Sequence, residues 1–164
     1  MRQSTSPAAA NGRTRPLRLA FLGALFWSAA AGASALLGLS HWADLARAAA
    51  VSERFALGAL IAFPAALFFA RPAARGGGRI RRFFTFLLLL GSATLGATGF
   101  VFALQSVLDA ASWHGHPVHL VGIWLFYTVL VGLYEFAVIG VRLYFPYGLA
   151  ALLAFSLWFA LRPR

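Results

Sequence analysis

The chain has 164 residues, of which 61% are apolar and only 11% are charged, a balance that excludes an ordinary soluble domain and indicates an integral membrane protein. Its positive charge, a net +10, is carried only by arginine, and because the arginines flank apolar segments they do not indicate nucleic-acid binding. The absence of cysteine excludes disulfides, thiolate metal ligands and a cysteine nucleophile.

Five apolar stretches predict an all-α, polytopic transmembrane helical bundle over residues 17–161. A helix rises about 1.5 Å per residue, so about 20 apolar residues cross a hydrocarbon core of about 30 Å. Residues 1–16 are expected to form a basic, disordered tail on the cytoplasmic side, and residues 162–164 a short C-terminal tail. The spans are expected near residues 17–39, 54–70, 83–108, 118–141 and 143–161.

The first span has two interpretations. Arginines before an apolar run, followed by the small-residue stretch AAAGASA, are typical of a cleavable signal peptide. The apolar run continues through Leu36, Leu37 and Leu39, however, and is longer than the apolar region of most signal peptides. This length favours a helix that is retained in the membrane.

Small residues recur four positions apart in two of the spans, as Ser28 and Gly32 in the first and as Ser92 and Gly96 in the third. In lipid, helices associate through close van der Waals contact, and small side chains let two backbones approach. The spacing therefore predicts helix–helix contacts inside the bundle. A face reserved for a partner protein is the alternative.

The loops predict the orientation of the chain. Arginines precede the first span and also fill the loop between the second and third spans, so both segments are expected to be cytoplasmic by the positive-inside rule. The N-terminus is then inside a bacterial-type inner membrane, and the segments 40–54 and 109–117 face outward. Five loop arginines are expected to contact the anionic headgroups of the lipid bilayer, namely Arg71, Arg75, Arg79, Arg81 and Arg82.

The four histidines all fall on the predicted outward side. His114, His116 and His119 occur in the stretch WHGHPVHL, and His41 follows the first span. Neutral imidazoles bind Zn, Cu or Ni, and two imidazoles from different helices can hold a haem iron. A transition-metal or haem site is therefore one hypothesis. His-x-His spacing without cysteine or a carboxylate framework is a weak signal, and it equally fits histidines at the membrane interface.

Glu135 is the only acidic residue inside a predicted span. An ionised carboxylate in the membrane is costly unless it is paired or faces water. Arg142 lies seven positions further on and nearly on the same helical face, which favours a charge pair near the inner interface. A proton or ion relay through Glu135 is the alternative.

The C-terminal segment is ambiguous. The residues FPYG at 145–148 fit a turn before a last helix. That helix has no amphipathic face to lie on the membrane surface, which favours a fifth span. A re-entrant or interfacial helix, which would keep Arg162 and Arg164 inside, is the alternative.

The motifs favour a protein without catalysis of its own. The sequence contains no phosphate-binding loop, no nucleophile motif and no paired catalytic carboxylates. The function that it favours is an accessory or interaction subunit of a membrane complex, bound to a membrane-protein partner or to a second copy of itself. A metal- or haem-binding subunit and a small transporter that uses Glu135 are the alternatives.

Overall fold

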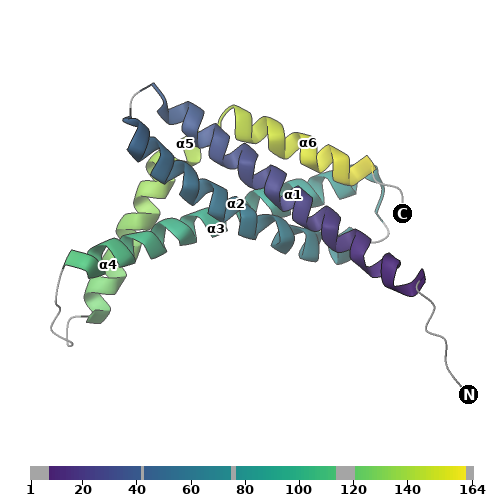
Figure 1. Ribbon diagram of the computed structural model, residues 1–164, viewed down its shortest axis with the longest axis horizontal. Coiled ribbons are helices and arrows are strands. Elements are labelled where there is room, and N and C mark those ends of the chain that lie inside the picture. The colour runs from purple at the N-terminus through teal and green to yellow at the C-terminus, as the bar shows by residue number, and fades with distance from the viewer. Residues whose placement is uncertain (1–7, 42, 75–76, 114–120, 162–164) are drawn as a thin grey trace, which may run out of the picture.

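The computed structural model describes residues 8–41, 43–74, 77–113 and 121–161, and every regular element in these ranges is a helix (Figure 1). The helical bundle predicted from the sequence is therefore confirmed. A π-helical turn, η2 (Phe136–Gly140), joins α4 to α5. The α-helices are α1 (Ala8–Leu39), α2 (Leu45–Ala73), α3 (Arg79–Trp113), α4 (Val121–Glu135), α5 (Val141–Leu143) and α6 (Tyr147–Leu161).

The helices α1, α2 and α3, and the continuous helical run from α4 through η2 to α5, are long enough to cross a membrane. α6 is shorter and apolar, and the chain as a whole has the helix lengths and composition of a multi-pass membrane protein. α1 already begins at Ala8, so part of the segment expected as a disordered tail is helical, because alanine and arginine are good helix formers. Four stretches are long and apolar enough to span a bilayer, namely Ala20–Leu39, Leu45–Ala73, Arg79–Ala110 and Gly122–Leu143.

The bundle is built along α3. α1 packs against α2, and α2 packs against α3. The first half of α3 carries α6 and its second half carries α4, so that the α3–α4 hairpin extends away from the other helices (Figure 1). At the centre, the fully buried Phe55 ring lies 4.9 Å from the Tyr144 ring and 5.8 Å from the Phe102 ring, measured between centroids. These aromatic contacts join α2 to α3 and to the residue that caps the end of α5.

The two predicted pairs of small residues have different surroundings. Ser28 donates a hydrogen bond of 2.8 Å to the carbonyl of Ala56 on α2, and Gly32 lies at the same α1–α2 contact. Ser92 is exposed and bonds the carbonyls of its own helix, and no described atom lies within 4 Å of a Cβ built at Gly96. The reason is the orientation of α3, which turns the face with Thr94 and Thr98 inward instead.

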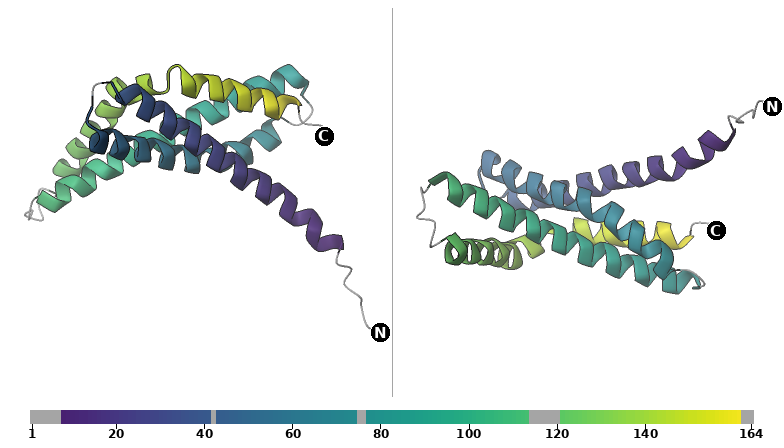
Figure 2. Two further views of the ribbon diagram at one scale, coloured as in Figure 1. Left: turned by 45° about the horizontal axis from the view of Figure 1, so that its top comes forward. Right: turned by 90° about the horizontal axis from the view of Figure 1, so that it is seen from below.

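The chain does not turn back on itself between α4 and α6. The Ser34 hydroxyl donates to the carbonyl of Leu143 at 2.7 Å and accepts from the amide of Gly148 at 3.2 Å, so the end of α5 and the start of α6 meet α1 at one level. At the far end, the Arg82 guanidinium donates to the carbonyl of Phe159 at 3.0 Å. α6 therefore ends beside the first turn of α3, whereas α4 lies along its second half (Figure 2).

This path differs from five spans of alternating direction, because α6 does not run back alongside α4. A helix break inside a bundle leaves backbone groups without helical partners, and burying them unsatisfied is costly. Ser34 supplies partners for two of these groups, which allows this side of the break to pack against α1. The end of α6 consequently lies at the arginine-rich end of the bundle, the side that the alternative for the C-terminal segment required.

Cysteine labelling tests this direction, since the natural chain contains no cysteine. In right-side-out and inverted vesicles, Leu161→Cys and Arg79→Cys are expected to react with a membrane-impermeant maleimide from one side, and Leu45→Cys from the other. All three positions are exposed at helix ends. Labelling of Leu161→Cys from the same side as Leu45→Cys would contradict the path of α6.

Candidate functional site

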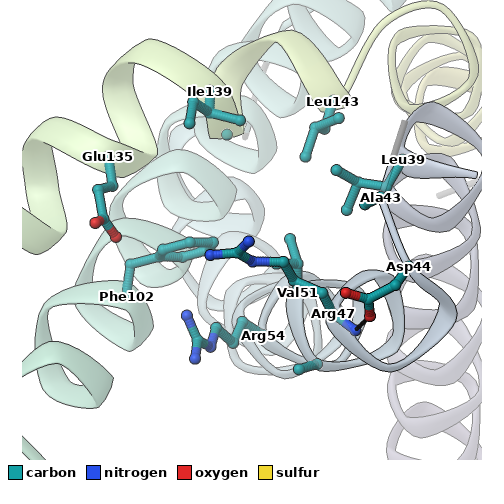
Figure 3. A pocket seen from close by; sticks show the side chains of 12 residues that line it. Leu39, Ala43, Asp44, Arg47, Val51, Arg54, Phe102, Glu135, Ile139 and Leu143 are labelled. Atoms are coloured by element: carbon teal, nitrogen blue, oxygen red, sulfur yellow. Dashed lines mark hydrogen bonds between the residues drawn. The ribbon is translucent and has the colours of Figure 1, made fainter. Parts of the chain in front are cut away.

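A cavity of about 610 Å³ lies at the end of the bundle that carries the α1–α2 connection (Figure 3). It separates α2 from η2 and the end of α4, and the second half of α3 contributes Phe102 to its wall. Most of the lining is apolar. Four charged side chains also line it, namely Asp44, Arg47, Arg54 and Glu135.

Asp44 is the residue that starts α2. Its backbone is extended and its carboxylate accepts a hydrogen bond of 2.8 Å from the backbone amide of Arg47, which is the usual role of an N-cap aspartate. This bond satisfies one of the free amides of the first turn and places Arg47 on the side of α2 that faces the cavity. The carboxylate of Asp44 is thus already engaged in stabilising the helix.

Arg47 and Arg54 lie seven residues apart and therefore on one face of α2. Arg54 is half-buried, with its guanidinium 3.8 Å from the carboxylate of Asp109 on α3 and 5.5 Å from the centre of the Phe102 ring. Gln105 also donates to Asp109, at 2.7 Å. Arg47 is more exposed and forms no ion pair with any residue that the structure describes.

Glu135 is the last residue of α4 and directs its carboxylate into the cavity, on the side opposite α2 (Figure 3). Across residues 8–41, 43–74, 77–113 and 121–161, no side chain forms an ion pair with Glu135. The side chain lies at the end of the bundle near the α1–α2 connection, not near the arginine-rich end where a pair with Arg142 was expected.

Arg142 is exposed and does not line the cavity. The seven-residue spacing from Glu135 would place both residues on one face of a regular α-helix. The π-helical turn Phe136–Gly140 intervenes, however, and its wider turn changes the register of the residues that follow. The pair predicted from the sequence is therefore not formed.

The chemistry available in the cavity is binding of charged groups. Guanidinium groups donate hydrogen bonds and carboxylates accept them, and both interactions are strong beside apolar walls. The described lining contains no serine, threonine, tyrosine or histidine that could act as a nucleophile or be activated by Glu135. The arrangement is suited to the recognition of charged groups.

The histidines stand apart from this cavity. His41 is exposed just after α1, whereas His114, His116 and His119 lie outside the described residues. Within the described part of the chain, no three histidine or acidic side chains come together as a metal-ion site would require. The metal and haem hypotheses stay predictions.

The arginines of the α2–α3 connection have separate roles. Arg71, Arg79 and Arg81 are exposed, as contact with headgroups would require, and Arg75 lies outside the described residues. Arg82 is half-buried, and besides its hydrogen bond to Phe159 its guanidinium lies 5.5 Å from the centre of that ring. Arg82 therefore joins α3 to α6.

Sequence reasoning did not select Arg47 and Arg54. A signal was present, because two arginines in a segment predicted to face outward are an exception to the positive-inside rule. Their spacing of seven residues also places both on one helical face. The sequence could not indicate that this face of α2 lines the same cavity as Glu135.

Comparisons with protein-family models, with curated proteins and with solved structures find no match. No relative therefore supplies a role for Arg47, Arg54 or Glu135. Their function has to be inferred from their chemistry and their position in the fold.

Proposed function

We propose that the chain is a non-catalytic membrane protein that holds the anionic group of a ligand between Arg47 and Arg54. The observation that carries this proposal is that both guanidinium groups extend from one face of α2 into the same cavity (Figure 3). A guanidinium is a planar fork of donors that matches the geometry of carboxylate and phosphate oxygens. The mainly apolar walls beside the guanidinium groups lower the local polarity, which strengthens such bonds.

The positive-inside rule supports an outward position for this site. The arginine-rich connection between α2 and α3 lies at the opposite end of α2 from Arg47, so if that connection is cytoplasmic the cavity opens toward the outer leaflet. The cavity lies close to the non-helical residues 43 and 44. In this orientation these residues lie at the depth of the lipid headgroups, and so does the cavity. The membrane that we propose is a bacterial-type inner membrane.

An accessory role in a membrane complex is consistent with this binding function. In an 18-residue apolar window of Gly122–Leu143 only 11% of the residues are buried, against 33% to 44% in the corresponding windows of the three other candidate spans. The stretch is apolar, and lipid or a membrane-protein partner can cover it. A small protein with such a ligand site would then present or retain a ligand for a larger assembly.

Native mass spectrometry with short-chain dihexanoylphosphatidylglycerol as the probe tests the binding function. Arg47→Gln and Arg54→Gln are each expected to weaken binding of one lipid molecule by about tenfold, since hydrogen bonds to charged groups contribute about 1.5–3 kcal/mol. Arg142→Gln is the matched control, because Arg142 is exposed and lies outside the cavity. Equal affinity in all three variants would disprove the proposed site.

A further inference from the structure

The charges of the cavity are not equivalent once their local partners are counted. Asp109 faces Arg54 at 3.8 Å, and the carboxylate of Asp44 caps α2. The two remaining charged side chains are Arg47 on α2 and Glu135 on α4, which lie on opposite sides of the cavity (Figure 3). Neither forms an ion pair with the other or with another described residue. The cavity therefore presents separated positive and negative binding groups.

This separation selects against ligands of one sign. A ligand that is only anionic would satisfy Arg47 but would be repelled by Glu135, and a ligand that is only cationic would meet the two arginines. A ligand that carries both signs satisfies both sides. The remaining walls are apolar and offer a charged group of the ligand no other partner.

The apolar walls also indicate what the charged group is attached to. Phe102, Ile139 and Leu143 come from three different elements and line the cavity together with Leu39 and Val51. Such walls suit a hydrocarbon portion next to a polar headgroup, and at about 610 Å³ the cavity is within the size range of small-molecule sites. A lipid therefore fits the lining better than a soluble zwitterion does.

We propose that the cavity binds the headgroup of an aminophospholipid, with the phosphate at Arg47 and Arg54 and the primary ammonium at Glu135. This inference rests on the proposed binding function. A primary ammonium donates hydrogen bonds to a carboxylate, whereas the quaternary ammonium of a choline headgroup has no N–H to donate. The site thus distinguishes ethanolamine from choline headgroups of equal net charge.

The experiment compares three short-chain lipids of equal chain length, with ethanolamine, choline and glycerol headgroups, by native mass spectrometry. The wild-type chain is expected to bind the ethanolamine lipid about tenfold more tightly than either other lipid. Glu135→Gln is expected to remove this preference. Glu53→Gln, which alters an exposed glutamate of α2 outside the cavity, is expected to retain it.

Arg47→Gln is expected to weaken the binding of the ethanolamine lipid and of the glycerol lipid by the same factor. Arginine-dependent binding with no preference for the ethanolamine lipid would overturn this inference and leave the proposed function intact. Absence of arginine-dependent binding of any lipid would overturn both.

Free phosphoethanolamine is the last probe. Its binding is expected to be weak, and an affinity equal to that of the lipid would overturn the assignment of the ligand to a lipid. Both Glu135 and Arg47 are exposed, so an unchanged melting temperature is expected for their variants.

Discussion

Gly58→Leu is expected to lower the melting temperature of the detergent-solubilised protein by about 10 °C, the largest stability effect that we predict for a single substitution. A Cβ built at Gly58 would lie 2.6 Å from the Cα of Thr98. That atom belongs to the backbone of α3 and cannot rotate away, so the two helices must separate. Their separation also disturbs the buried 2.8 Å hydrogen bond between Thr98 and the Tyr144 hydroxyl.

The matched control for this effect is Gly96→Leu on α3. No described atom lies within 4 Å of a Cβ built at Gly96, and leucine forms helices better than glycine by about 1 kcal/mol. The control is therefore expected to leave the melting temperature unchanged or slightly raised. Thermal unfolding followed by circular dichroism measures both variants, and equal melting temperatures would show that α2 and α3 do not meet at Gly58.

Gly132→Leu is expected to separate α4 from α3 and to remove Glu135 from the cavity. A Cβ built at Gly132 would lie 2.9 Å from the Cα of Ala103 and 2.9 Å from the carbonyl oxygen of Phe102, both backbone atoms of α3. We expect binding of the ethanolamine lipid to fall by more than about tenfold. Spin labels at the exposed positions 104 and 130 should report a longer and broader distance between the two helices.

Gly122→Leu is the control for this second substitution. Gly122 lies on the same helix, is exposed and has no described atom within 4 Å of a built Cβ. Binding and the spin-label distance should match those of the wild-type chain. A loss of binding in Gly132→Leu without any change in distance would contradict the proposed role of α4 in placing Glu135.

The location of the helices was largely predictable from hydropathy, and their ends were not. The second span was expected over residues 54–70, whereas α2 covers Leu45–Ala73. Hydropathy reports the part of a helix that suits hydrocarbon, but α2 continues through Arg54 and Arg47 to its cap at Asp44. The extension that hydropathy did not predict carries Arg47, and the expected span begins at Arg54, the second arginine of the candidate site.

The candidate site was predictable in part. Glu135 could be selected because a lone carboxylate in an apolar segment is rare and costly. Its pairing with Arg142 could not be judged from spacing, because the π-helical turn after Glu135 changes the register of the residues that follow. Arg47 and Arg54 are far from Glu135 in the sequence, so their shared cavity depends on the packing of α2 against the α3–α4 hairpin.

The sequence by itself determined that the protein is an all-helical membrane protein. The reason is that the apolar composition of a segment and the length of its apolar run determine whether the segment is stable in hydrocarbon or in water. Only the tertiary structure decided that α6 does not turn back alongside α4 and that Arg47 and Glu135 line opposite sides of one cavity. The physical reason is that hydropathy is a local quantity that carries no direction. The path of the chain and the opposition of the two charges depend instead on a few contacts between distant residues, such as the hydrogen bonds of Ser34 and the close approach at Gly132.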